Sequence, residues 1–127
     1  MAKQGALKQN GVHLREHEYQ TVKILLNEGY DIELIPPSQI KGLPMPDIMM
    51  SGIPWEIKSP NGKGKNTIKH ILQKAKHQSD SIIIDLRRSQ LDENQVIAEL
   101  KHHYQLSKRL RRMKIITKNG KILDFFK

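Results

Sequence analysis

The residue types with the clearest potential for chemistry lie close together near the middle of the chain: Asp47, Glu56 and Lys58. Two neighbouring carboxylates can hold a divalent cation beside a phosphate, and an ammonium group can neutralise the charge that builds there. Side chains alternate along a β-strand, so Glu56 and Lys58 share one face of any strand that contains both. These residue types at this spacing indicate hydrolysis of a phosphodiester bond.

A tight hairpin would bring Asp47 across from Glu56. Two short apolar runs flank Ser51-Gly52, which is a typical two-residue turn. With this turn Met50 pairs with Ile53, and continuing the register pairs Asp47 with Glu56, with Cβ atoms about 4.5–5.5 Å apart. Opposed carboxylates repel each other unless something lies between them. We therefore expect Asp47 and Glu56 to share a divalent metal, Mg²⁺ being the simplest choice.

A third carboxylate, Glu18, could close the site from a neighbouring helix. On a helical wheel it falls close to the apolar edge formed by Val22 and Leu25, whereas His17 points away. A carboxylate at the border of a buried face is costly unless it is paired or binds a ligand. His13 and His17 have the i, i+4 spacing of metal ligands but lack a further ligand, so we expect them to be surface histidines.

The charge of the chain favours a polyanionic partner. Among 127 residues, 22 Lys+Arg against 13 Asp+Glu give a net charge of +9. No acidic residue lies between Ile57 and Ser79 or between Lys101 and Leu123. Such basic segments are typical of nucleic-acid-binding proteins. The residues predicted to bind nucleic acid are Lys63, Lys65, Lys69, Lys74, Lys76, Lys108, Arg109, Arg111 and Arg112.

Composition excludes several other classes of protein. The chain has no cysteine, which rules out disulfides, cysteine zinc sites and thiol catalysis. No apolar run approaches the roughly 20 residues of a membrane span, and the first residues lack the apolar segment of a signal peptide. The length suits one domain, which we place at residues 14–127 after a flexible N-terminal tail at 1–13.

The elements that must position these residues follow from apolar periodicity and turn residues. The pattern predicts the order α-β-β-β-α-β-α-β-β, which is typical of an α/β fold with a mixed β-sheet sandwiched by helices. The expected helices cover residues 14–27, a segment starting at 66 or 67, and 92–108. The expected strands cover 30–35, 47–50, 53–58, 81–86, 113–117 and 121–125, the last two flanking Asn119-Gly120.

A resemblance to known nucleases rests on these residues. Pro46-Asp47, then Glu56-Ile57-Lys58, a helix and an Ile-rich strand resemble the PD-(D/E)xK nuclease superfamily. The stretch from Pro46 to Pro60, with Asn66-Thr67-Ile68 and the segment 81–86, is more closely similar to the C-terminal tRNase toxin domain of CdiA-type contact-dependent growth inhibition proteins. The likeness extends back to Glu18 and to residues 27–31, and so covers most of the chain after the tail.

The resemblance implies a restriction-endonuclease-like core and a ribonuclease toxin that cleaves tRNA. It further implies delivery into a competitor, action in the cytoplasm of that target cell, and neutralisation by a cognate immunity protein, which we expect to be acidic. The matching catalytic positions are Glu18, Asp47, Glu56 and Lys58, with Ser59 and Thr67 as auxiliary polar groups.

Three alternatives stay open from the sequence. The ribose 2′-hydroxyl can attack the phosphate, in which case the same residues could act as base and charge stabiliser without a metal. A DNA endonuclease of the same fold, from a mobile or restriction system, would need the same groups. A noncatalytic nucleic-acid-binding module would bind in a salt-sensitive way and never turn over.

Overall fold

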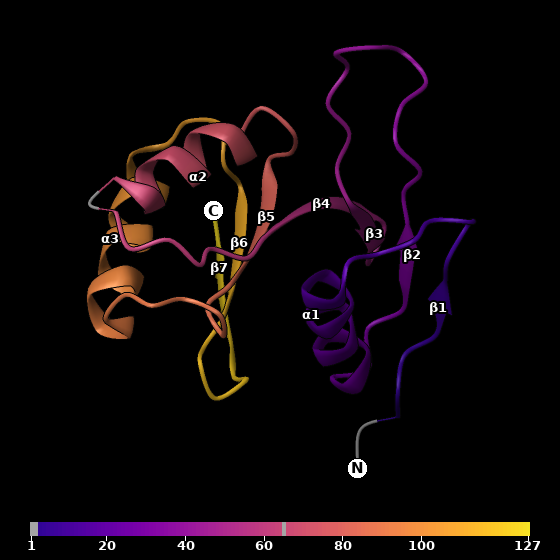
Figure 1. The fold of residues 1–127 in the computed structure, drawn as a ribbon, viewed down its shortest axis with the longest axis horizontal. Helices are drawn as coiled ribbons and strands as arrows, with labels where there is room; N and C mark the ends of the chain where they lie inside the picture. The colour runs from indigo at the N-terminus through magenta and orange to yellow at the C-terminus, as the bar shows by residue number, and fades with distance from the viewer. Residues whose placement is uncertain (1–2, 65) are drawn as a thin grey trace.

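A seven-stranded mixed β-sheet runs through the molecule, with its strands in the order β1-β2-β3-β4-β5-β6-β7 (Figure 1). The computed structural model describes residues 3–64 and 66–127. Within these residues no helix is long and apolar enough to cross a membrane. The strands are β1 (Leu7–Lys8), β2 (Ile32–Leu34), β3 (Ile48–Met50), β4 (Ile53–Lys58), β5 (Ser81–Asp85), β6 (Arg112–Ile116) and β7 (Ile122–Phe126), and the helices are α1 (Glu16–Asn27), α2 (Thr67–Ala75) and α3 (Glu93–Leu106).

The hairpin of β3 and β4 has the register expected from the sequence. Met50 pairs with Ile53, and Ile48 pairs with Trp55. Ser51 and Gly52 both have positive φ, 56° and 74°, as a type I′ turn requires. The predicted pairing is therefore confirmed along β3.

Strands β4, β5 and β6 are parallel, and the two helices α2 and α3 make the crossovers between them. Parallel neighbours end at the same edge of a sheet, so the last residues of β4 and β5 lie side by side. Every residue of β5 is buried, as its continuous apolar run predicts for a strand covered on both faces. The edge at which β4 and β5 end therefore carries Lys58 and Asp85 as neighbouring strand ends.

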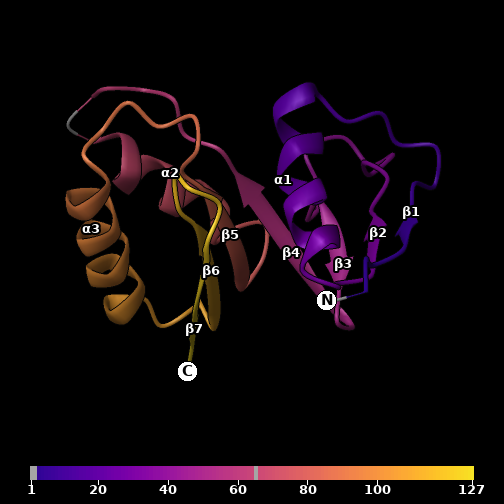
Figure 2. The same ribbon diagram turned by 90° about the horizontal axis from the view of Figure 1, so that it is seen from below.

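Helices cover both faces of the sheet (Figure 2). The core beneath α1 contains Val22 and Leu25 together with Ile57 and Ile83 of the sheet. The core beneath α2 and α3 contains Leu72, Leu100, Ile82 and Ile84. Because alternate residues face opposite ways, the partners of Ile82 and Ile84 in β4 point toward α2 and α3. Those partners are Glu56 and Lys58.

The N-terminal segment departs from the expectation of a flexible tail at residues 1–13. Leu7–Lys8 forms β1 and pairs in parallel with β2. Asp31 also accepts a hydrogen bond from the backbone N–H of Ala6, and Leu7 and Val12 pack against the core beneath α1. This segment satisfies the backbone groups at the outer edge of β2, which would otherwise stay unpaired. Residues 1 and 2 lie outside the described part of the chain.

The other elements occur in the predicted order, with ends that differ by at most two residues. The mixed sheet between helices is thus confirmed, with β1 added at its edge. Trp55 is buried in the core, and its Nε1 donates to the carbonyl of Met50. The more specific expectation of a PD-(D/E)xK core stays a prediction.

Candidate functional site

Asp47 lies just before β3, and two hydrogen bonds hold it against β4. Its backbone N–H donates to the carbonyl of Trp55 at 3.0 Å, and its Oδ2 accepts from the N–H of Ile57 at 2.8 Å. These two partners are the residues on either side of Glu56. The hairpin therefore brings the carboxylate of Asp47 to Glu56, as the sequence predicts.

Glu56 is the most unusual carboxylate of the site. It is only 2% exposed, and its Oε2 forms an ion pair with Lys58 Nζ at 3.0 Å. Its Oε1 is buried and has no hydrogen-bond partner within the described residues. Burial and the nearby charge of Asp47 raise the pKa of Glu56 to about 8, although Lys58 acts in the opposite direction. Glu56 can therefore gain or release a proton near neutral pH.

Lys58 ends β4 and reaches toward solvent from the same face as Glu56. Its side chain is 25% exposed, so the ammonium can meet a ligand while it stays paired with Glu56. The loop that follows folds back over the start of α2. A Cβ on Gly62 would lie 3.2 Å from Oγ1 of Thr67, which shows how closely this loop passes the first residue of the helix.

Glu18 lies across a groove from Asp47. Both residues line this groove, which has a volume of about 340 Å³ between the start of α1 and the loop before β3. The Oε1 of Glu18 accepts a hydrogen bond from the N–H of Arg15 at 3.0 Å and so caps α1. No hydrogen bond or ion pair joins Glu18 to the other three predicted catalytic residues in the described part of the chain. The structure thus unites Asp47, Glu56 and Lys58, and places Glu18 nearby with a capping partner.

The two carboxylates fit a divalent cation that takes part of its coordination from elsewhere. Among residues 3–64 and 66–127, no group of three or more His, Cys, Asp or Glu residues could hold a metal. Mg²⁺ commonly uses one or two carboxylates and completes its shell with water and substrate phosphates. The unpartnered Oε1 of Glu56, beside Asp47, is an atom that such a cation would satisfy.

The predicted nucleic-acid-binding residues occupy several surfaces. Lys69 of α2 and Lys76, directly after that helix, line a groove of about 190 Å³ together with His103 near the end of α3. Arg112 is half-buried, with Asp80 at 3.9 Å and a hydrogen bond to Ser81, so it has protein partners. Lys65 lies outside the described residues. The remaining predicted residues are exposed: Lys63, Lys74, Lys108, Arg109 and Arg111.

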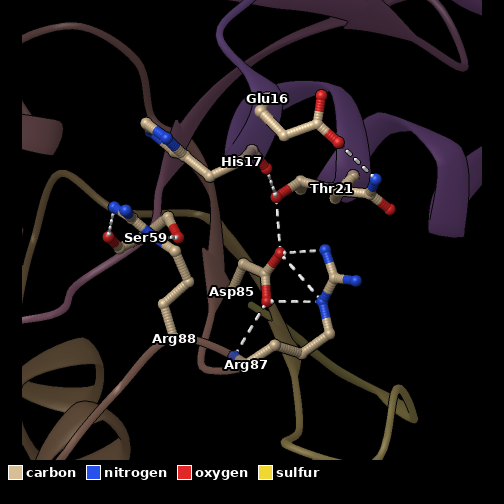
Figure 3. Close-up of polar contacts among 8 residues, drawn as sticks. Glu16, His17, Thr21, Ser59, Asp85, Arg87 and Arg88 are labelled. Carbon is tan, nitrogen blue, oxygen red and sulfur yellow. Dashed lines mark hydrogen bonds and ion pairs between the residues drawn. The ribbon is translucent and has the colours of Figure 1, made fainter.

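A buried ionic network that the sequence did not reveal fixes α1 to the sheet (Figure 3). Asp85, at the end of β5, forms a forked ion pair with Arg87 and accepts a hydrogen bond from Thr21 of α1. Burial alone would raise the pKa of Asp85, but the bonds from Arg87 and Thr21 outweigh it and hold that pKa below its ordinary value. The network places the first turn of α1, with Glu18, at the ends of the parallel strands.

His17 corrects a second expectation. The helical wheel predicted that its side chain faces solvent, but His17 is half-buried and lies over the strand ends. The physical reason is that the loops after β4 and β5, which carry Ser59 and Arg88, lie beside the start of α1 (Figure 3). His13 is exposed, as predicted.

Comparison with known proteins identifies the family. A sequence model of the contact-dependent growth inhibition CdiA C-terminal domain matches residues 44–122. The chain belongs to this family. The matched part of this CdiA C-terminal domain contains Asp47, Glu56, Lys58 and the Asp85–Arg87 ion pair, whereas Glu18 and Thr21 precede it. The expected resemblance is therefore confirmed at the level of the family.

A solved structure also resembles the CdiA C-terminal domain described above. It is described as "CdiA-CT/CdiI toxin and immunity complex from Burkholderia pseudomallei". The likeness has a TM-score of 0.70 at 18% sequence identity, and it covers 97% of this chain and 100% of that chain. At this identity it shows a common fold. No curated protein sequence matches the chain.

Proposed function

We propose that this CdiA C-terminal domain is a ribonuclease toxin that cleaves phosphodiester bonds of tRNA. The observation that carries the proposal is the buried carboxyl of Glu56, held between Asp47 and Lys58. Within residues 3–64 and 66–127, its Oε1 has no hydrogen-bond partner, and nothing in the packing requires its pKa of about 8. Perturbed groups of this kind cluster at functional sites because burial and charge pairs tune them for proton transfer.

In the proposed mechanism each residue has a distinct task. Without a metal, Glu56 would accept the proton of the attacking 2′-hydroxyl, because its pKa of about 8 allows both protonation states near neutral pH. Lys58 neutralises charge on the scissile phosphate from the same face. Asp47 and Glu56 would hold a divalent cation, Mg²⁺ for preference, which as a Lewis acid polarises the phosphate when bound. Glu18 is proposed as a third catalytic carboxylate, and Ser59 and Thr67 as auxiliary polar groups around this centre.

The basic surface supports a nucleic-acid substrate and an acidic protein partner. The net charge is +9, and both polyanions and acidic proteins are attracted to such a surface. The similar solved structure is a complex of a toxin with its immunity protein. We propose that a cognate, acidic immunity protein neutralises this chain as well, and that the chain acts in the cytoplasm of a target cell after delivery.

Expression in cells followed by gel analysis of total RNA tests the proposal. We expect induction of the wild-type chain to deplete tRNA and produce shorter fragments, and Glu56→Gln and Lys58→Ala to abolish this. Lys8→Ala is a matched control, because Lys8 is an exposed cation paired with Glu33 on β2, and it should cleave like the wild type. Intact tRNA after induction of soluble wild-type chain would overturn the proposal.

Purified substrates separate the remaining possibilities. Incubation with plasmid DNA in place of tRNA detects a DNA endonuclease of the same fold. Cleavage that continues in a chelator, with cyclic phosphate ends, would show that the 2′-hydroxyl attacks without a metal. Salt-sensitive binding without turnover at any metal concentration would leave only a binding module.

A further inference from the structure

Two consecutive arginines, Arg87 and Arg88, follow β5, and their side chains have different partners. Arg87 forms a forked ion pair with the buried Asp85, with Nη2 and Oδ2 2.7 Å apart, so its charge is neutralised. Arg88 is exposed and is held by the neutral Ser59 (Figure 3). Its Nε donates to Ser59 Oγ at 3.0 Å, and its Nη2 donates to the Ser59 carbonyl at 2.9 Å. Arg88 therefore has a fixed position and a positive charge that no carboxylate balances within the described residues.

The position of Arg88 is next to the candidate active site. Ser59 directly follows Lys58, and β4 and β5 are parallel neighbours whose ends meet at one edge of the sheet. The two hydrogen bonds that Arg88 donates to Ser59 thus hold the guanidinium at the residue after Lys58. A nucleic-acid strand whose scissile phosphate lies at Lys58 would pass this edge with its neighbouring phosphates.

The surroundings of Arg88 favour an anion. The side chain of His17, from the first turn of α1, lies on the same side of the site as the Arg88 head group (Figure 3). The acidic groups nearby have other partners, because Asp85 binds Arg87 and Glu16 accepts a hydrogen bond from Gln20 at 2.7 Å. His17 and Arg88 thus offer two nitrogen-bearing side chains on this side of the site, and the two carboxylates drawn with them, those of Glu16 and Asp85, already have partners.

We propose that Arg88, assisted by His17, binds a backbone phosphate of the nucleic acid adjacent to the one held at Lys58. Arginine suits this task because its planar guanidinium can bind phosphate oxygens in a forked geometry, and a guanidinium that is already positioned loses little freedom on binding. Ser59 accepts from Nε and Nη2, so Nη1 is not used by Ser59 and is available to a phosphate oxygen. The inference rests on the proposed function in one respect, namely that the substrate is nucleic acid.

Binding of fluorescently labelled tRNA tests the inference in the full chain. All variants carry Glu56→Gln, so that the substrate stays intact, and anisotropy is measured over a series of salt concentrations. We expect Arg88→Ala to weaken binding roughly tenfold at low salt and to reduce the slope of log K against log salt by about 1. His17→Ala should give a smaller loss, and Ser59→Ala an intermediate one, because Ser59 only fixes the guanidinium.

Two controls separate phosphate binding from charge and from stability. Lys8→Ala removes the same unit of charge from a distant ion pair with Glu33, and it should change the affinity little. Arg87→Ala should lower the melting temperature, since Asp85 loses its partner, and the folded fraction should bind tRNA nearly as the parent does. Arg88→Ala should melt like the parent.

The outcomes distinguish this inference from the proposed function. Unchanged affinity and salt slope in Arg88→Ala, an equal loss in Lys8→Ala, or no tRNA binding by the parent would each overturn the inference. If the chain with Glu56 intact cleaves tRNA but Arg88→Ala binds normally, only the inference fails. If Arg88→Ala weakens binding but no cleavage depends on Glu56, the inference stands and the ribonuclease proposal fails.

Discussion

Replacing Glu56 by Gln should stabilise the fold at alkaline pH and change its stability little at acidic pH. The reason is that Glu56 is buried beside Asp47, and its pKa rises from 4.5 to about 8 in the folded chain. A carboxyl with a raised pKa binds its proton more tightly in the folded than in the unfolded state. The contribution of Glu56 to the stability of the wild type is thus fully present below pH 4.5, and it is lost as the pH rises through about 8.

The size of the effect follows from the shift. A change from 4.5 to about 8, at about 1.4 kcal/mol per pH unit, sets an upper bound of about 5 kcal/mol. Water near the partly exposed Asp47 and Lys58 screens these charges, so we expect a stability difference of about 2–3 kcal/mol. Glutamine resembles the protonated carboxyl in shape and avoids the repulsion from Asp47, and it should recover most of this free energy above pH 8.

Urea denaturation at pH 5 and pH 9, with a chelator present, measures the difference. Glu33→Gln is the matched control, because the side chain of Glu33 is 43% exposed and paired with Lys8 at 3.4 Å, and it should show no such gain with pH. If the stability of Glu56→Gln relative to the wild type is the same or lower at pH 9 than at pH 5, the argument that burial and the charge of Asp47 raise the pKa of Glu56 is wrong.

Other predictions follow from the same structure. Adding Mg²⁺ at pH 9 should raise the melting temperature of the wild type but not that of Asp47→Asn, and an equal rise in both would exclude Asp47 as a ligand. Asp85→Asn leaves Arg87 without its partner and should cost about 3–4 kcal/mol in urea denaturation. Because the pKa of Asp85 lies below 3.8 in the folded chain, the wild type should lose this contribution as the pH falls through the acid range, while Asp85→Asn should not. Gly5→Ala would place a Cβ 1.7 Å from the carbonyl oxygen of Tyr30. The substitution should therefore displace the N-terminal segment and accelerate amide hydrogen exchange in β2, and unchanged exchange would show that this segment does not pack against β2.

The hairpin of the candidate site could be predicted from sequence because all its determinants are local. Ser51-Gly52 sets the turn, and the two-residue period sets which side chains share a face. These two facts determine that Asp47 approaches Glu56 and that Lys58 accompanies it, and the structure has this arrangement.

The features that sequence reasoning missed depend on contacts between distant segments. Thr21 and Asp85 are 64 residues apart, and nothing in either segment indicates their hydrogen bond. The strand β1 is two residues long, too short for any apolar period, so its pairing with β2 is settled by the free edge of β2. One signal was present, because an aspartate at the end of an apolar strand, followed by two arginines, is costly to bury without a cationic partner.

Glu18 illustrates a limit of helical-wheel reasoning. The wheel correctly placed it near the apolar edge of α1, and it lines the same groove as Asp47. A wheel cannot show that its carboxylate bonds to the backbone of Arg15 at the start of the helix. The role of Glu18 in catalysis stays a prediction, and it requires that this capping bond gives way when substrate binds.

Incubation of purified tRNA with the purified chain, wild type against Glu56→Gln, tests the central claim most directly. We expect discrete tRNA fragments from the wild type and none from the variant, with circular dichroism spectra that match at pH 7. Identical fragments from both proteins, or intact tRNA with both over a range of Mg²⁺ concentrations, would contradict the claim that the buried Glu56 carboxyl is the centre of a ribonuclease site.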